Sequence, residues 1–330
     1  MKSDEEKLKE LFEMKEEPSF NNTIKRAKTF SMIRTIIISL MIFITFSTAL
    51  LIANSFILNY VGNKELNKLQ TWFQVAMPNA YMGNTQADDR IMIGEVEYPR
   101  YRFLGEKPVL DGVFKEDYSY MPLINGIYGD LGYHLFDSKG ESFKELEEMR
   151  RYNKAGKRVM KFYHPSISYD KHINDLEELN NIEKDKLIEI SLSFDKSYSL
   201  EEAKALVPEG ITLNWYWVDT LDKNDKDNLS KSILEEDEVY GIKALDNQGK
   251  EMKKPEESFI NSIMRGNLNK DTHYRYESLF KVLSRGKSEI TKEDLGIIGV
   301  VVSGDVETLK ALKNLNYIKA ATIGAVADKY

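Results

Sequence analysis

The chain has 330 residues, a formal net charge of −7, 42% hydrophobic residues and no Cys. The absence of Cys excludes disulfides, thiolate zinc sites and a cysteine nucleophile, and the acidic balance disfavours nucleic acid as a direct partner. An apolar content this high predicts that most of the chain folds rather than remains disordered.

Residues 1–17 predict a short, highly charged helix, which Ser3 can cap. Leu8, Leu11 and Phe12 form a narrow apolar stripe on it at helical spacing. A lone helix of this length is marginal in water. It therefore acts either as a solubilising tail or as a segment that folds against a partner through this stripe.

Residues 35–58 form an uncharged, strongly apolar stretch. About 20 apolar residues suffice to cross the hydrocarbon core of a bilayer as a helix. A cleaved signal would have a shorter apolar region ending in an A-x-A-like site, and a soluble core helix would normally keep one polar face. The stretch predicts a retained transmembrane helix.

The flanking charges predict its orientation, because Lys and Arg collect on the cytoplasmic side of a membrane helix. Residues 18–34 contain no acid, and residues 59–71 hold two Lys against one Glu. We therefore expect residues 1–34 in the cytoplasm and residues 59–330 outside. The topology-determining cations are Lys25, Arg26, Lys28 and Arg34.

The first extracytoplasmic part is predicted over residues 59–185, and it begins with a helical stalk over 59–71. Gly, Pro and Asn alternate with short β-prone runs after it, and the run "IMIGEVEYPRYRF" predicts two strands. Further elements are expected as a helix near 141–151, a strand at 158–164 and a helix at 170–182.

Residues 186–330 carry the clearest pattern and predict a second extracytoplasmic domain. A strand at 187–194 precedes a helix that Ser199 and Glu202 cap, and a strand at 211–220 follows. We expect Ile211, Leu213, Trp215 and Trp217 to share one face of that last strand.

The end of this domain repeats the same order of elements. After two helices at 256–266 and 274–285, a strand at 296–305 is apolar enough to be buried on both faces. Asp305 can cap the next helix, and a last strand covers 318–327. The predicted fold is a single-pass membrane protein with an extracytoplasmic α/β (α+β) region, whose mixed sheet is built from βαβ-like units.

No catalytic, cofactor-binding or metal-ligating constellation is recognisable in the sequence. The four His, at 134, 164, 172 and 273, lack ligand spacing and suggest ordinary, partly exposed side chains. "SGD" at 303–305 could take an anion at a helix N-terminus, although a helix cap explains it better. The acidic run "LEEDEVY" at 234–240 could hold a cation, although a solvated loop is the more usual explanation. We therefore expect no enzyme and no cofactor.

Several longer segments resemble one family, the membrane-anchored sigma factor regulators of Gram-positive bacteria. They are "KRAKTFSMIRTIIISLMIF", "GEVEYPRYRFLGEKPV", "YNKAGKRVMKFYHP", "ALVPEGITLNWYWVDT" and "GVVVSGDVETLKALKNLNYIKAATIGAVADKY". The resemblance covers most of residues 24–330 and implies an anti-sigma factor. Many such proteins have a larger cytoplasmic domain with a zinc-binding pattern. This chain departs from them, because its expected cytoplasmic segment has 34 residues and the chain contains no Cys.

The leading hypothesis is an anti-sigma factor-like transcription regulator that sequesters an extracytoplasmic-function sigma factor at the membrane and senses an external signal. The resemblance implies that sigma factor as a cytoplasmic partner, and a second membrane regulator and the lipid bilayer are further candidate partners. Leu8, Leu11 and Phe12 are the candidate sigma-binding residues. The alternative is a membrane-tethered, extracytoplasmic ligand- or cell-wall-binding protein whose tail only sets topology.

Overall fold

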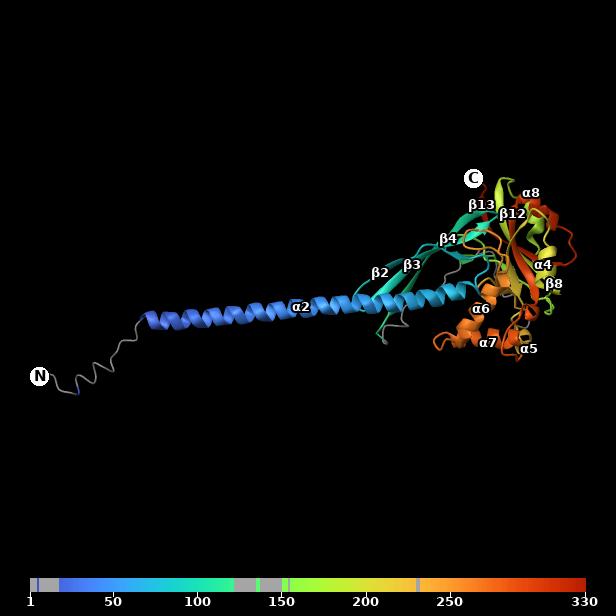
Figure 1. Ribbon diagram of the computed structural model, residues 1–330. Coiled ribbons are helices and arrows are strands. Elements are labelled where there is room, and N and C mark those ends of the chain that lie inside the picture. Colours follow the sequence, from blue (N-terminus) through green and yellow to red (C-terminus); the bar gives the residue numbers. More distant parts are fainter. Residues whose placement is uncertain (1–4, 6–17, 122–134, 137–149, 154, 230–231) are drawn as a thin grey trace. The chain divides into compact units, whose positions relative to one another are not determined.

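The structure is a computed structural model that describes residues 5, 18–121, 135–136, 150–153, 155–229 and 232–330 (Figure 1). The chain divides into two compact units, Met1–Asn59 and Tyr60–Tyr330. The predicted helix over residues 1–17 lies outside the described residues, apart from position 5.

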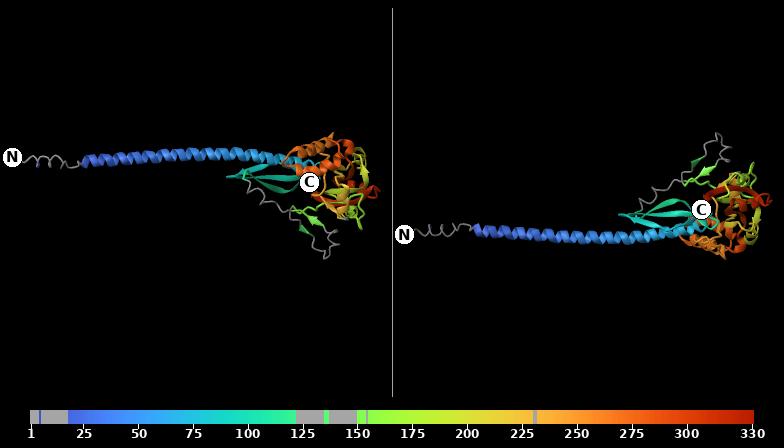
Figure 2. Two further views of the ribbon diagram at one scale, coloured as in Figure 1. Left: turned by 90° about the horizontal axis from the view of Figure 1, so that it is seen from below. Right: turned by 90° about the horizontal axis from the view of Figure 1, so that it is seen from above.

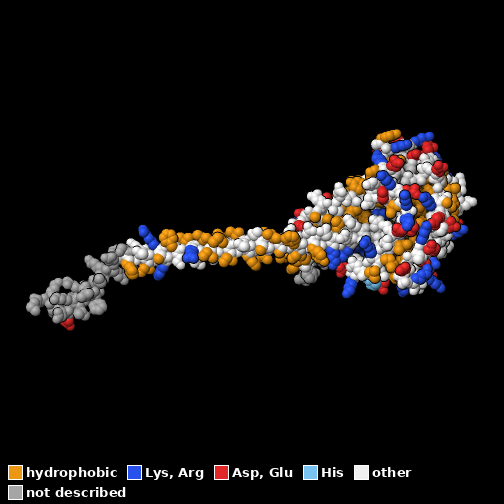
Figure 3. Space-filling view, in the orientation of Figure 1, with side chains coloured by type: hydrophobic (Ala, Val, Ile, Leu, Met, Phe, Trp, Pro, Cys, Tyr) orange, Lys and Arg blue, Asp and Glu red, His pale blue; other side chains and the backbone are white. Residues whose placement is uncertain are grey.

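Apart from residue 5, the described residues of the first unit all belong to helix α2 (Pro18–Phe73). It is long and apolar enough to cross a membrane, and its apolar side chains cover its surface, with Lys and Arg near the N-terminal end (Figure 3). The Thr hydroxyls bond back to their own helix, for example from Thr45 Oγ1 to the Met41 carbonyl at 2.8 Å. Such bonds make hydroxyl groups compatible with a hydrocarbon environment.

The second unit begins with the end of α2 and a four-stranded antiparallel sheet. β3 (Ile93–Leu104) pairs along its length with β4 (Lys107–Ser119), and it also pairs with β1 (Tyr81–Met82) and β2 (Gln86–Asp89). The prediction of two strands in "IMIGEVEYPRYRF" is wrong, because one continuous strand covers it from Ile93. A bulge leaves Asp111 of β4 without an opposing residue and turns its carboxylate into the interior.

The prediction of a mixed sheet is wrong, because the sheet is antiparallel throughout. A five-stranded sheet has the order β11-β9-β12-β8-β13, and every neighbouring pair in it is antiparallel. The connections β8–α4–β9 and β12–α8–β13 each join parallel strands, but another strand lies between the two in both cases. This is the split βαβ arrangement of ferredoxin-like folds. The strands and helices are β8 (Lys186–Tyr198), α4 (Leu200–Ala205), β9 (Thr212–Val218), β11 (Gly241–Lys243), β12 (Ile297–Asp305), α8 (Val306–Leu309) and β13 (Ile318–Asp328).

The predicted common face of β9 is also wrong, because the strand contains a bulge. Val301 of β12 pairs with Trp215, but Val302 pairs with Leu213, so Asn214 is the extra residue. Ile211 and Leu213 consequently pack into the helix-covered core, whereas Trp215 and Trp217 pack on the opposite side with Phe162. Both Trp side chains are buried, as the alternation predicted.

The local signals in the last domain are confirmed. The capping box of Ser199 and Glu202 starts α4, and the Asp305 side chain accepts a hydrogen bond from the Thr308 N–H at 2.9 Å. β12 is buried along both faces, as its apolar run predicted. Two helices, α6 (Pro255–Leu268) and α7 (His273–Ser284), match the expected pair.

The predicted helix at 170–182 is a short 3-10 helix instead, and the strand expected at 158–164 is reduced to two residues. Most of the helix expected at 141–151 lies outside the described residues, and its last residue belongs to a strand. The remaining elements are β5 (Leu135–Phe136), β6 (Arg151–Tyr152), β7 (Lys161–Phe162), η1 (Asp175–Asn180), α5 (Lys223–Leu229), β10 (Leu234–Glu235), η2 (Lys292–Asp294) and η3 (Lys310–Leu312).

Candidate functional site

The last part of α2, residues 60–73, is built into the second unit. It runs between strands β2–β4 and helices α6 and α7, as both views of Figure 2 show. Trp72 makes edge contacts with Tyr240 and Tyr276, with ring centroids 5.6 and 5.4 Å apart. The stalk predicted over 59–71 is therefore helical, and its C-terminal turn is anchored in the folded unit.

The chain that leaves α2 covers the open edge of the five-stranded sheet. Ala76 forms a bridge with Tyr240, and the Gly241 N–H donates to the Val75 carbonyl at 2.8 Å. Val75 is fully buried in the main core. Because these hydrogen bonds join the helix end directly to β11, a displacement of the helix end has to disturb the sheet edge.

A buried lysine lies at this junction. Lys243 of β11 donates from Nζ to the Ala80 carbonyl at 2.6 Å, and the ammonium lies over the rings of Tyr81 and Phe73 at 4.6 and 5.5 Å. No carboxylate among the described residues forms an ion pair with it. Burial lowers the pKa of Lys243 from its ordinary value of 10.5 to about 7.

Replacing Lys243 by Met should therefore stabilise the second unit near neutral pH. The unfolded chain binds the lysine proton more tightly than the folded chain does, so native stability falls as the pH drops from 10.5 to about 7 and then levels off. We expect the Met variant to be more stable by about 1–3 kcal/mol at pH 7, and the difference should shrink as the pH rises towards 10.5.

Urea unfolding of the full chain at a series of pH values measures this difference. Lys250→Met, at an exposed position nearby, should follow the wild-type pH dependence. Parallel pH dependences for wild type and Lys243→Met would show that Lys243 carries no such penalty.

A buried cluster of charges joins the β3–β4 hairpin to the five-stranded sheet. The guanidinium of Arg102 forms ion pairs with Asp111, Glu189 and Glu236 at 3.0, 3.1 and 2.7 Å. Asn79 donates to Glu189 Oε1 at 2.7 Å and to the Phe103 carbonyl at 2.9 Å. Every buried charge in the cluster is thus matched by an opposite charge or a hydrogen bond, as burial in an interior requires.

The cluster changes the proton affinities of its carboxylates in opposite directions. Burial raises the pKa of Glu189, and this outweighs the opposing effect of Arg102. Burial would also raise the pKa of Asp111, but the guanidiniums of Arg102 and Arg100 hold it below its usual range. Arg102 itself is held firmly in its charged form by the three carboxylates.

The acidic run at 234–240 belongs to these ion pairs. Glu236 contacts Arg102, and Glu235 contacts Arg151 at 2.9 Å. Neither a cation site nor a fully solvated loop describes them, because Glu235 is buried and its partner comes from β6. Sequence analysis could not find these pairs, since the partners lie more than 80 positions away.

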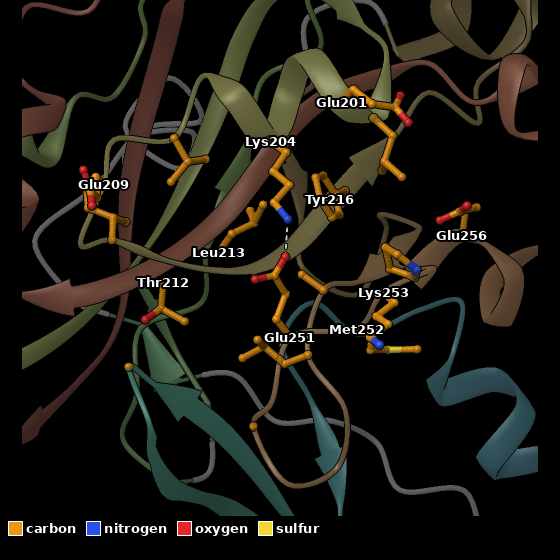
Figure 4. A pocket seen from close by; sticks show the side chains of 18 of the residues that line it. Glu201, Lys204, Glu209, Thr212, Leu213, Tyr216, Glu251, Met252, Lys253 and Glu256 are labelled. Carbon is orange, nitrogen blue, oxygen red and sulfur yellow. Dashed lines mark hydrogen bonds and ion pairs between the residues drawn. The ribbon is translucent and has the colours of Figure 1, made fainter.

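A cavity of about 690 Å³ lies between α4, β9 and the segment that joins β11 to α6 (Figure 4). Its wall combines charged and apolar side chains, with Val207, Ile211, Leu213 and Met252 among the apolar ones. Lys204 and Glu251 face each other across it and form an ion pair (Figure 4). A cavity of this size, with apolar side chains beside converging charged groups, fits a small ligand.

The residues singled out in the sequence are placed as follows. Leu8, Leu11 and Phe12 lie outside the described residues. Residues 303–305 end β12, where Asp305 caps α8 as the simpler explanation predicted. The topology-determining cations are exposed on α2; they are Lys25, Arg26, Lys28 and Arg34.

The histidines differ from one another more than the sequence suggested. His164 is fully buried, and its Nε2 lies 3.1 Å from Asp219 Oδ1, so the expectation of partial exposure is wrong there. His172 and His273 are exposed, and His134 lies outside the described residues. The described residues contain no group of three or more His, Asp or Glu arranged to hold a metal ion.

Two family models match successive parts of this chain. The sigma factor regulator N-terminal model matches residues 21–109, which include most of α2 and all of β3. The sigma factor regulator C-terminal model matches residues 179–325, which include four strands of the five-stranded sheet and most of the fifth, β13. The chain belongs to the sigma factor regulator family. Neither a curated protein nor a solved structure matches it.

Membership of the sigma factor regulator family gives the chain an anti-sigma factor role in transcription regulation, with a sigma factor as partner. Proteins of this family are regulatory rather than enzymatic. The apolar part of α2 suggests anchoring in a membrane.

Proposed function

We propose that this sigma factor regulator is a single-pass membrane protein that holds an extracytoplasmic-function sigma factor inactive on the cytoplasmic side. Residues 1–34 bind the sigma factor, residues 35–58 cross the membrane, and residues 59–330 respond to an external signal. The family match carries the proposal, because its N-terminal part includes the apolar span itself.

The structure of the junction supports a route for the signal. The helix end is hydrogen-bonded to the sheet edge through Val75 and Gly241, and Trp72 packs against α7. A ligand that changes the packing of the second unit would therefore act on the end of α2, and through α2 on the cytoplasmic segment. Such coupling requires that the ligand prefer one of two packing states.

The topology part of the proposal predicts that the C-terminus lies outside the cytoplasm. An alkaline phosphatase fused after Tyr330 should be active, because the positive charges before the span stay inside the cell. A fluorescent protein that folds only in the cytoplasm should remain dark when it is fused at the same position. Neutralising the four cations, as Lys25→Gln, Arg26→Gln, Lys28→Gln and Arg34→Gln, should produce a mixed orientation. An inactive phosphatase beside a bright cytoplasmic reporter would reverse the whole assignment of compartments.

A further inference from the structure

One carboxylate in the cavity below α4 has no partner. Glu256, in the first turn of α6, is 9% exposed and lines the cavity. Within the described residues it makes no hydrogen bond or ion pair, and its carboxylate points towards the cavity (Figure 4). A buried charge normally has a counter-ion, and the position of Glu256 at a helix N-terminus supplies only part of that compensation.

The other charged groups of the cavity do not supply the missing cation. Five Glu and three Lys line it, which leaves a net charge of −2. Lys204 is paired with Glu251 and Lys292 with Glu201, which also line the cavity, and within the described residues Lys253 forms no ion pair with Glu256. The negative charge also acts on Tyr216: burial raises the pKa of its phenol, and the carboxylates of Glu251, Glu201 and Glu256 raise it further.

Apolar side chains face the same space as Glu256. Leu213 and Met252 lie on either side of the Lys204–Glu251 ion pair in Figure 4, and Val207 and Ile211 also line the cavity. We propose that this cavity binds an amphipathic cation, whose ammonium group pairs with Glu256 and whose aliphatic part lies against Leu213 and Met252. The exposed ion pair between Lys204 and Glu251 crosses the space and contributes little stability of its own, so a ligand can displace it.

This inference gives the proposed sensing role a ligand class, but its test measures binding alone. A failure of binding therefore leaves the sigma-binding proposal intact, and a failure of sigma binding leaves this site intact. The ligand is defined by a primary alkylammonium group, and a shape-matched set of probes separates charge from apolar contact.

The experiment uses the full chain in lipid nanodiscs with ¹³C-labelled Met methyl groups, and it follows the Met252 signal, which is assigned through Met252→Leu. The probes are hexylammonium, hexan-1-ol and hexanoate, which share one aliphatic chain. Hexylammonium should shift the Met252 signal with an affinity about tenfold tighter than the alcohol, a difference equivalent to one charge-assisted contact. Hexanoate should bind most weakly.

Two variants localise the effect. Glu256→Gln keeps the shape of the side chain and should weaken hexylammonium binding about tenfold, while hexan-1-ol binding stays unchanged. Glu257→Gln changes the exposed neighbour in the same helical turn, which does not line the cavity, and should bind as wild type does. The proposal would be overturned if the Met252 signal did not shift, or if hexanoate bound at least as tightly as hexylammonium. Unchanged hexylammonium binding in Glu256→Gln would overturn it as well.

Discussion

Replacing Arg102 by Met should lower the free energy of unfolding of the Tyr60–Tyr330 unit by about 3–5 kcal/mol. The Met side chain fills similar space but leaves Asp111 and Glu189 buried without their shared cation. Glu236 would lose its partner as well, and the contact between the β3–β4 hairpin and the five-stranded sheet would weaken.

Urea unfolding of the full chain, followed by tryptophan fluorescence, measures the loss. Arg90→Met is the matched control, because Arg90 pairs with Asp88 in an ion pair whose partners are 72% and 59% exposed. That variant should lose no more than about 1 kcal/mol. Equal unfolding midpoints for the two variants would mean that the Arg102 cluster does not hold the hairpin on the sheet.

The second large effect is expected from the double variant Leu11→Ala with Phe12→Ala, which should release the sigma factor and raise transcription of its target genes. A short helix cannot bury such a stripe alone, and a groove on a partner would bury it in the helix-in-groove mode. Apolar anchors usually dominate affinity, so we expect binding to weaken by at least about tenfold.

A target-promoter reporter, read at equal membrane abundance of each variant, tests this. Reversing the charges of Glu5 and Glu6 should release the sigma factor more weakly, because rim charges mainly tune encounter rate and salt dependence. If the double alanine variant represses as well as wild type, the stripe is not the sigma-binding element. The segment 21–34 would then be the next candidate.

Local sequence signals predicted the elements of the C-terminal domain well. The capping residues Ser199, Glu202 and Asp305 start helices where they were expected, and the apolar run of β12 is buried on both faces. These features depend on neighbours within four residues or on a single strand, so one sequence is enough to reveal them. The order of the strands was not accessible in the same way, because strand–helix–strand connections allow a third strand to lie between the two.

The bulges account for two further differences. An extra residue in β9, Asn214, reverses the alternation halfway along the strand and places Trp215 opposite the face of Leu213. An extra residue in β4, Asp111, supplies an interior carboxylate to Arg102. The position of a bulge depends on pairing with the neighbouring strand. The alternation of residues along a single strand therefore cannot reveal it.

The candidate site was missed for a related reason. Arg102, Glu189 and Glu236 come from three distant segments, and Glu256 belongs to a helix that sequence analysis treated as ordinary. The sequence signal available for them was weak, since charged residues at such spacing usually lie on solvated faces. Only the fold shows that these carboxylates are buried, and burial is what makes them chemically informative.

Site-specific photo-crosslinking in living cells tests the central claim most directly. A crosslinking amino acid is placed at Phe12, at Phe20 or at Tyr274, which is 69% exposed on α7, and the captured proteins are identified by mass spectrometry. The account predicts an extracytoplasmic-function sigma factor bound at Phe12 or Phe20, and none at Tyr274. Absence of a sigma factor at both N-terminal positions, or its capture at Tyr274, would contradict the account.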